Sequence, residues 1–286
     1  MSRAKRQHYV PQFLLKNFAG ENGKVEVFDK KTCSFRYQST GEIAHESGFY
    51  LYTLDGNRVD GEEITKVVDN FGAVEFDKIV RAKTLGIPVL QSREDISMFI
   101  AFQALRVPSA VDRMRDTFEQ IDALLDTIPD CDDKRKLQNE IRCVDSHQES
   151  LKFLFFECER LSAFLMDKLW ALSETVESED FWISDNPISF TRHDKSRAGA
   201  GFGTPFTEVA LPVSPTLRLR LISRDFLYAL TKDPVWCRAI GRGIPVPSPS
   251  YNVHHQRVVQ LANASRFVYA KQFDRKLVVD LFNEYC

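Results

Sequence analysis

The alternation of apolar and polar positions predicts a short antiparallel sheet near the N-terminus. The runs Lys24–Phe28 and Ser34–Tyr37 are strand-like and are separated by a polar stretch that begins at Asp29. Two β-prone runs joined by a few polar residues are typical of a hairpin. Phe49–Thr53 has the same character and is expected to add a third strand.

Apolar positions then recur with a helical period. In Glu62–Arg81 they fall at the spacing of one helix face, which predicts a helix. Gly86 and Pro88 interrupt the pattern, because these residues break regular structure. Ser92 resembles an N-cap residue, and the helix that it opens is expected to stop near Pro108.

Two or three more helices are predicted up to about Thr175. The first is Ala110–Ile128, and the polar interval Asp130–Arg142 that follows it is expected to be exposed. From residue 181 onward, Pro and Gly recur and short β-prone runs replace the helical pattern. The elements predicted there are the strands Glu208–Leu211 and Leu217–Ile222, the helix Ser250–Ala264, the strand Arg266–Ala270 and a terminal helix from Asp274.

Helices and strands that segregate along the chain predict an α+β fold. We expect an N-terminal small antiparallel sheet, a central helical bundle, and a C-terminal strand-rich part packed against it. The length of 286 residues suits a single compact domain over residues 1–286. Within it we expect an N-terminal hairpin region at 1–60, a helical part at 61–178 and a strand-rich basic part at 179–286.

The composition is that of an ordinary globular protein. With 43% hydrophobic and 12% aromatic residues, the chain is neither disordered nor collagen-like. No stretch approaches the roughly 18 consecutive apolar residues of a membrane span, and the N-terminus lacks the apolar core of a secretory signal. The six cysteines lie too far apart for a zinc knuckle or a redox pair. We therefore expect reduced thiols and a cytoplasmic protein without membrane contact.

Charge is unevenly distributed although the net charge is only -2. Residues 192–276 hold fourteen Lys and Arg against five Asp and Glu, a local balance of +9. Such a basic segment attracts phosphates, so nucleic acid or a nucleotide is an expected partner. The alternative is that this segment pairs with the acidic helices earlier in the chain. A protein is a further candidate partner.

His8 is the first candidate for chemistry. It stands among apolar residues in the phrase HYVPQFLLKNF, and Pro11 biases the preceding residue toward an extended shape. A histidine presented in this way serves as a general base or a metal ligand. The alternative is a hydrogen-bonded histidine that anchors the N-terminus to the core.

Gln103 and Arg106 end a largely apolar helix. Being three residues apart, they lie on one helix face and are expected to point into the same pocket. The planar guanidinium of Arg106 suits a carboxylate or phosphate. The alternative is that Arg106 bonds the last carbonyls of its helix or pairs with a core acid.

Asp185 and Asn186 follow a strand in the phrase FWISDNPI, where polar side chains at a strand end commonly form sites. Asp185 is a candidate base or a ligand for a divalent cation such as Mg²⁺ or Mn²⁺. Asp and Asn before Pro are also ordinary turn formers, and that alternative stays open. Three acidic residues are weaker candidate partners for Asp185: Glu46, Glu63 and Glu75.

These phrases together resemble the bacterial and fungal family called domain of unknown function 4238. That family is recognised by a His-Tyr-Val-Pro-Gln start, a Gln and Arg-Pro helix end, and a Ser-Asp-Asn-Pro turn. Here Val107 separates Arg106 from Pro108, a mild departure that leaves the arginine in place. With Leu211–Pro215, and with Asn252 preceding Arg266–Ala270, the likeness covers essentially the whole chain.

The resemblance implies a shared architecture and draws attention to particular residues, and it implies no reaction. Those residues are His8, Gln12, Gln103, Arg106, Asp185 and Asn186.

The leading hypothesis is a hydrolase of a phosphate-containing substrate, nucleic acid or a nucleotide, acting as a bacterial defence or toxin effector. His8, Arg106 and Asp185 would be catalytic, as base or ligand, charge stabiliser and metal site respectively. The residues that would bind or orient the substrate are Gln12, Gln103, Asn186, Asn252 and Arg266. The rival hypothesis is a non-catalytic binding or sensor module in which the same polar residues form a structural network.

Overall fold

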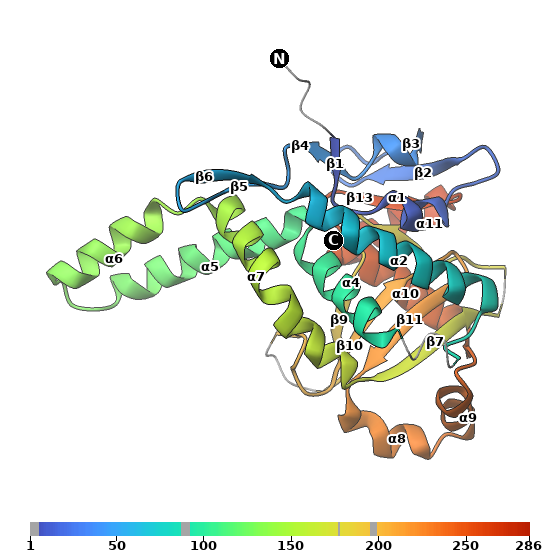
Figure 1. The fold of residues 1–286 in the computed structure, drawn as a ribbon. Coiled ribbons are helices and arrows are strands. Elements are labelled where there is room, and N and C mark those ends of the chain that lie inside the picture. The colour runs from blue at the N-terminus through green and yellow to red at the C-terminus, as the bar shows by residue number, and fades with distance from the viewer. Residues whose placement is uncertain (1–5, 87–91, 177, 195–198) are drawn as a thin grey trace.

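The N-terminal hairpin belongs to a four-stranded sheet that the C-terminal part of the chain completes. The computed structural model describes residues 6–86, 92–176, 178–194 and 199–286 (Figure 1). Strands β2 (Lys24–Asp29) and β3 (Ser34–Ser39) pair antiparallel and confirm the predicted hairpin. Strand β13 (Phe267–Ala270) pairs with β2, and β8 (Ile183–Ser184) pairs with β13, giving the order β3-β2-β13-β8.

The expected third strand of the hairpin sheet lies elsewhere. Strand β5 (Leu51–Leu54) pairs with β6 (Asn57–Asp60) in a separate two-stranded ribbon. A second ribbon joins β1 (Arg6–His8) to β4 (His45–Ser47). In the four-stranded sheet β3 is an edge strand, and the sheet grows from β2 toward β13, a distant segment, rather than toward the next strand in sequence.

A five-stranded sheet forms the C-terminal half of the fold. Its order is β12 (Val246–Ser248), β7 (Leu169–Thr175), β11 (Leu217–Ile222), β10 (Thr207–Pro212) and β9 (Ser189–Arg192). Only β12 runs parallel to its neighbour. The strands predicted at 208–211 and 217–222 are confirmed, whereas the helical pattern predicted to about residue 175 ends earlier. Residues 169–175 are a strand because β11 and β12 pair with them on both sides.

The central helices follow the predicted pattern closely. They are α2 (Glu62–Ala82), α4 (Arg93–Leu105), α5 (Pro108–Asp126), α6 (Asp132–Arg142) and α7 (Ser146–Met166). The interval 130–142 is exposed as expected, but it forms α6, which packs on α5. These two helices project from the rest of the chain (Figure 1). The predicted break at Pro88 lies outside the described residues.

The remaining helices include two that the pattern did not indicate. These are α8 (Leu227–Thr231) and α9 (Pro234–Arg242), which follow the 3-10 turn η2 (Arg224–Phe226). The predicted helices at 250–264 and from 274 are confirmed as α10 (Ser250–Asn263) and α11 (Arg275–Tyr285). Short pieces near the N-terminus are α1 (Gln12–Lys16) and the 3-10 turn η1 (Thr40–Glu42).

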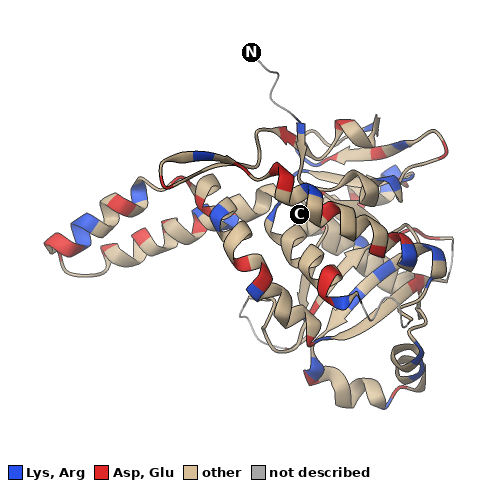
Figure 2. Cartoon of the chain, in the orientation of Figure 1, with Lys and Arg blue, Asp and Glu red and all other residues tan. Residues whose placement is uncertain are grey.

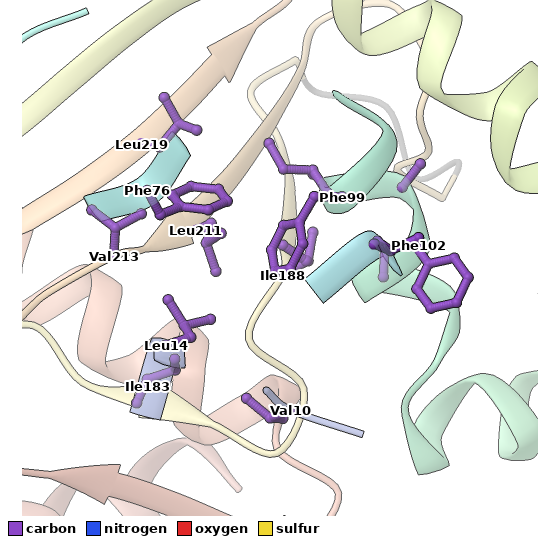
Figure 3. Packing of buried hydrophobic residues seen from close by; sticks show 14 of the residues in the cluster. Val10, Leu14, Phe76, Phe99, Phe102, Ile183, Ile188, Leu211, Val213 and Leu219 are labelled. Atoms are coloured by element: carbon purple, nitrogen blue, oxygen red, sulfur yellow. The ribbon is translucent and has the colours of Figure 1, made fainter. Parts of the chain in front are cut away.

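The main core lies between the helices and the five-stranded sheet. Phe76 of α2 and Phe99 of α4 pack edge to face, with ring centroids 5.0 Å apart. Figure 3 shows Phe76 beside Leu211 and Leu219 of the sheet, and all of these side chains are buried. A Cβ at Gly72 would lie 2.4 Å from the Phe99 ring, so glycine is what allows α2 and α4 to approach this closely.

A smaller apolar cluster fills the space between the four-stranded sheet and the last two helices. Phe28 of β2, Trp182, Leu261 of α10 and Val278 of α11 meet there. The four-stranded sheet thus joins residues from the first and the last predicted subdivisions. The single-domain prediction with its divisions after residues 60 and 178 stays a prediction.

Among the described residues, none of the helices has the length and apolarity that a membrane span requires.

Candidate functional site

His8 ends β1 with its ring directed into a tight polar environment. Its ring centroid lies 5.3 Å from that of His45, the residue opposite in the β1–β4 pairing. The Nε2 atom of His8 is buried and has no hydrogen-bond partner among the described residues. Burial, and secondarily His45, lowers the pKa of His8 below its ordinary value. The imidazole is therefore neutral near pH 7 and retains a nitrogen that can accept a proton.

Arg106 lies directly after α4 and is fully buried. Its Nε donates to Oε1 of Gln103 at 2.8 Å, and its Nη2 lies 2.6 Å from Oδ1 of Asp69 on α2. Burial alone would lower the pKa of Arg106, but Asp69 and Tyr50 outweigh burial and raise it. Among the alternatives left open by the sequence, pairing with an acid is the one found here.

The same residues fasten the N-terminal strand to the helices. Nε2 of Gln103 donates to the main-chain oxygen of Tyr9 at 2.9 Å. The Tyr50 hydroxyl donates to the main-chain oxygen of His8 at 2.7 Å. We call His8, Tyr50, Asp69, Gln103 and Arg106 the N-terminal network. Its contacts hold the main chain at His8 to the residue before β5 and the main chain at Tyr9 to α4.

A pocket of about 250 Å³ opens beside this network, and we call it the N-terminal pocket. His8 and Gln12 line one wall, and α2 supplies the other with Asp69. The sequence reasoning missed Asp69 and instead considered Glu63 and Glu75 of the same helix. The lining positions of α2 are 62, 65, 66, 69, 70 and 73, which share one helix face, but only the packing of the helix shows that this face meets the pocket.

Asp185 occupies a second, separate network, in which its carboxylate is enclosed by main chain. Oδ1 accepts from the N–H of Ser265, and Oδ2 accepts from the N–H groups of Arg266 and Phe267, each at 2.8 Å. The side chain is 2% exposed. Burial raises the pKa of Asp185 to about 6, although the three N–H groups act in the opposite direction. These contacts reach main chain 80 to 82 residues away, so they are not the bonds of a local turn, and the predicted roles of Asp185 stay predictions.

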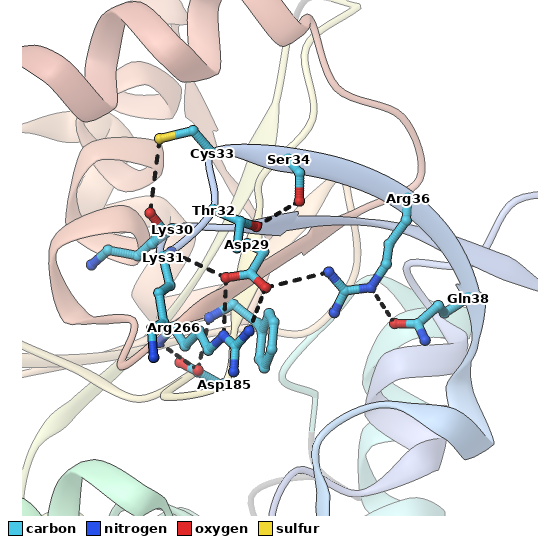
Figure 4. A network of polar contacts seen from close by, with 11 residues as sticks. Asp29, Lys30, Lys31, Thr32, Cys33, Ser34, Arg36, Gln38, Asp185 and Arg266 are labelled. Atoms are coloured by element: carbon cyan, nitrogen blue, oxygen red, sulfur yellow. Dashed lines mark hydrogen bonds and ion pairs between the residues drawn. The ribbon is translucent and has the colours of Figure 1, made fainter.

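Arg266 and Asn186 extend this second network. Nε and Nη2 of Arg266 donate to the two carboxylate oxygens of Asp29 at 3.0 and 2.8 Å, a bidentate pair visible in Figure 4. Nδ2 of Asn186 donates to the main-chain oxygen of Asn263 at 3.1 Å. We call Asp29, Asp185, Asn186 and Arg266 the Asp185 network. It ties β2, the turn after β8 and the end of α10 together.

The predicted site residues thus fall into two groups. His8, Gln12, Gln103 and Arg106 gather at the N-terminal network and its pocket, while Asp185, Asn186 and Arg266 form the other network. Asn252 belongs to the first turn of α10, where its N–H donates to the Pro249 oxygen at 2.9 Å.

The weaker acidic candidates make other contacts. Glu63 and Glu75 each pair with a lysine of α2, at 2.7 and 2.6 Å. Glu46 lies on β4, opposite Gln7 of β1. Within the ranges that the structure describes, no group of three or more His, Cys, Asp or Glu side chains is placed to hold a metal ion. Binding of Mg²⁺ or Mn²⁺ stays a prediction.

Arginines of the basic segment 192–276 meet buried acids inside the five-stranded sheet. Arg220 donates to both carboxylate oxygens of Glu208, at 2.8 and 2.6 Å, and Arg218 lies 3.8 Å from the same group. Burial would raise the pKa of Glu208, but these guanidinium groups hold it well below its usual range. Glu208 belongs to the same segment, so these contacts engage two of its arginines without changing its net balance.

Other arginines of this segment pair with acids from earlier in the chain. Besides Arg266 with Asp29, Arg275 lies 2.7 Å from Glu26. Both acids belong to β2 rather than to a helix. Figure 2 shows both signs of charge interspersed along α2, α6 and α7. The basic residues at 195 and 197 lie outside the described part of the chain, and nucleic acid as a partner stays a prediction.

A comparison of the sequence with known protein families shows to which family the chain belongs. The family described as Protein of unknown function (DUF4238) matches residues 6–274. The chain belongs to this family. The match confirms the resemblance that the three sequence phrases indicated. No curated protein and no solved structure matches the chain.

Each of the three sequence motifs of this DUF4238 chain has a different structural role. The His-Tyr-Val-Pro-Gln start supplies the last residue of β1, one wall of the N-terminal pocket and the first residue of α1. The helix end with Gln103 and Arg106 holds that start in place. The Ser-Asp-Asn-Pro turn anchors the link between α10 and β13. In this DUF4238 chain, the motifs therefore mark the points where distant segments are joined.

Proposed function

We propose that this DUF4238 chain is a non-catalytic binding or sensor module whose motif residues hold distant segments of the fold together. The observation that carries the proposal is the carboxylate of Asp185, both of whose oxygens accept main-chain N–H groups. A carboxylate that is occupied in this way stabilises a loop and has little capacity left for a substrate or a cation.

The environment of Arg106 supports the same proposal. Its side chain is fully buried, and its guanidinium is directed at Asp69 and Gln103. A charge stabiliser in a hydrolase has to face the substrate. Arg106 instead positions Asp69 and neutralises its charge.

We also assign the protein to the cytoplasm as part of this proposal. Its six cysteines form no disulfides, and five of them are exposed. Free exposed thiols are typical of proteins in a reducing compartment.

A hydrolase acting at the N-terminal pocket is the second candidate, because a specific observation favours it. The unpartnered Nε2 of His8 and the carboxylate of Asp69 share this pocket, and a neutral histidine is suited to act as a general base. Gln12 lines the same wall and would orient the substrate. The predicted defence or toxin role belongs to this candidate, since it requires turnover of nucleic acid or a nucleotide.

The charges that line the N-terminal pocket argue against a hydrolase of phosphate esters, so we rank this function second. Glu62 and Asp69 line it against a single cation, Lys66. Arg106 neutralises Asp69, and Glu62 offsets Lys66, so with His8 neutral the described lining offers a phosphate dianion no net attraction. A hydrolase of phosphate esters at this position would need a cation that the described residues do not supply.

Turnover assays separate the two functions. Purified wild type, incubated with bis(p-nitrophenyl) phosphate, nucleotides or oligonucleotides and with Mg²⁺ or Mn²⁺, is expected to hydrolyse none of them above the buffer rate. His8→Ala is expected to behave identically. The matched control is His254→Ala, which removes an exposed histidine of α10.

The opposite result is well defined. General base catalysis contributes about 10²–10⁴-fold to a rate. Wild-type turnover that falls by at least about a hundredfold in His8→Ala, and is retained in His254→Ala, would replace the binding module by the hydrolase.

A further inference from the structure

A second pocket, of about 350 Å³, lies between α9, the start of α4 and the start of β7. Four basic side chains line it, and we call it the cationic pocket. Arg93 is the first residue of α4, and Lys168 directly precedes β7. Arg224 is the first residue of η2, and Arg242 is the last residue of α9. The fold therefore collects one cation from each of four segments that are far apart in sequence.

The backbone that shapes this pocket is tightly constrained. Gly243 follows α9 with φ +65°, and its oxygen accepts from the N–H of Leu85 at 2.7 Å. A Cβ at Gly243 would lie 2.7 Å from the Leu85 carbonyl, so only glycine fits both the left-handed turn and the close approach. This contact fixes the end of α9, and with it Arg242, against the segment that follows α2.

Carboxylates balance only part of the positive charge in this pocket. No acidic side chain is among its described lining residues. Asp167 pairs with Arg224 at 3.0 Å, and Asp167 and Asp225 also lie close enough to Lys168 to raise its pKa against the effect of burial. Among the described residues, these two carboxylates thus stand near four cations. Like charges placed together without a counter-charge destabilise a fold unless an anion joins them.

The half-buried Arg93 and the buried Lys168 are held by main chain and by an aromatic ring. Nη2 of Arg93 donates to the Lys168 oxygen at 3.2 Å, and its guanidinium lies 4.8 Å above the Trp170 ring. The Nε atom of Arg93 is buried without a hydrogen-bond partner among the described residues. Nζ of Lys168, which is 6% exposed, donates to the Thr207 oxygen at 3.3 Å. Both side chains are thus pre-positioned and retain unused N–H donors.

The pKa values of Lys168 and Arg93 reflect their position in this pocket. Burial lowers the pKa of Lys168 and of Arg93, and Arg224 lowers the pKa of Arg93 further. A dianion among these side chains would reverse both effects, because it favours the charged form of each.

We propose that the cationic pocket binds the phosphate group of a small phosphorylated metabolite. Guanidinium and ammonium groups together match phosphate, which accepts several charge-assisted hydrogen bonds at once. The volume falls in the range of small-molecule sites. Leu85, Leu169 and Ile240 supply an apolar wall for the rest of the ligand. The inference rests on the proposed binding function and names the chemical class of its ligand.

Calorimetric titration of the full chain tests this assignment. The ligands are inorganic phosphate, AMP and, as a singly charged carboxylate, acetate, all at one ionic strength because salt screens charge. Phosphate and AMP are expected to bind and acetate is not. Arg224→Gln and Arg242→Gln each remove one charge-assisted hydrogen bond, so affinity for AMP is expected to fall about ten- to hundredfold.

Arg238→Gln is the matched control. Arg238 is an exposed residue of the same helix α9 that does not line the pocket, and its substitution removes the same charge. AMP affinity is expected to stay within about twofold of wild type, because salt screens an exposed charge that does not touch the ligand. Equal weakening by Arg238→Gln and Arg242→Gln would assign the effect to general surface charge and overturn the site.

Failure of this inference is distinguishable from failure of the proposed function. Absence of phosphate and AMP binding in the wild type, without turnover, rejects the cationic pocket alone. Release of phosphate from AMP during the titration, abolished in His8→Ala, rejects the non-catalytic function, while affinities that drop in Arg224→Gln and Arg242→Gln still support the pocket.

Discussion

Arg106→Ala is expected to lower the free energy of unfolding by about 3–5 kcal/mol, the cost of breaking a buried ion pair by removing one partner. The guanidinium is fully buried, lies 2.6 Å from Asp69, and stacks 5.2 Å from the Phe102 ring. Its loss leaves Asp69 without its cation and Gln103 without one of its partners. It also opens a cavity between α2 and α4, which adds to the cost.

Urea unfolding followed by circular dichroism measures this effect. The matched control is Arg115→Ala, which removes an exposed arginine of α5 that pairs with Asp112 three residues earlier. It is expected to change stability by no more than about 0.5 kcal/mol. The double variant Arg106→Ala/Asp69→Ala is expected to be more stable than the sum of the single effects predicts, because it removes both partners of the pair.

The contrary outcome would reassign Arg106. Loss of stability below about 1 kcal/mol would mean that the ion pair with Asp69 contributes little to the fold. Arg106 would then be kept for a purpose other than structure, and the hydrolase candidate would gain support.

Asp185→Ala is expected to lower the free energy of unfolding by about 2–4 kcal/mol at pH 7. Three main-chain N–H groups lose a charged acceptor, and each such bond contributes about 1.5–3 kcal/mol. Removing a buried charge offsets part of this loss. Thermal and urea unfolding measure it, with Asp233→Ala as control. Asp233 also accepts main-chain N–H groups, at the start of α9, but is exposed, so a loss of about 1 kcal/mol is expected.

The pH dependence of this effect has a definite sign. Burial raises the pKa of Asp185 to about 6, above its value of about 4 in the unfolded chain. The folded state therefore binds the proton more tightly, so the stability that Asp185 contributes falls as pH rises from about 4 to about 6. The destabilisation by Asp185→Ala is expected to be larger at pH 4.5 than at pH 7, by an amount on the order of 3 kcal/mol or less.

Urea titrations of wild type and variant across this pH range measure that difference. A difference that grows toward neutral pH would mean that the three N–H donors outweigh burial. Asp185 would then be held ionised at all physiological pH values, and its role in the loop would be purely that of an anion.

The N-terminal network shows what sequence reasoning could anticipate. The phrase around His8 and the pair Gln103 and Arg106 were recognisable as polar positions in apolar surroundings, and the structure brings them together. Asp69 was not found, because one carboxylate on an acidic helix carries no local mark. Its distinction is a contact with Arg106, 37 residues away, and only the packing of α2 on α4 creates that contact.

Local periodicity by itself determined α2, α4, α10 and the β2–β3 hairpin, because their apolar spacing or turn residues specify each element within a few neighbouring residues. Only the tertiary structure decided that β13 rather than β5 completes the N-terminal sheet, and that residues 169–175 are a strand. Only the tertiary structure placed Arg93, Lys168, Arg224 and Arg242 around one pocket. These features depend on which segments pack against each other. The stabilising contacts join residues that are far apart in the sequence, so no short stretch of sequence contains both partners.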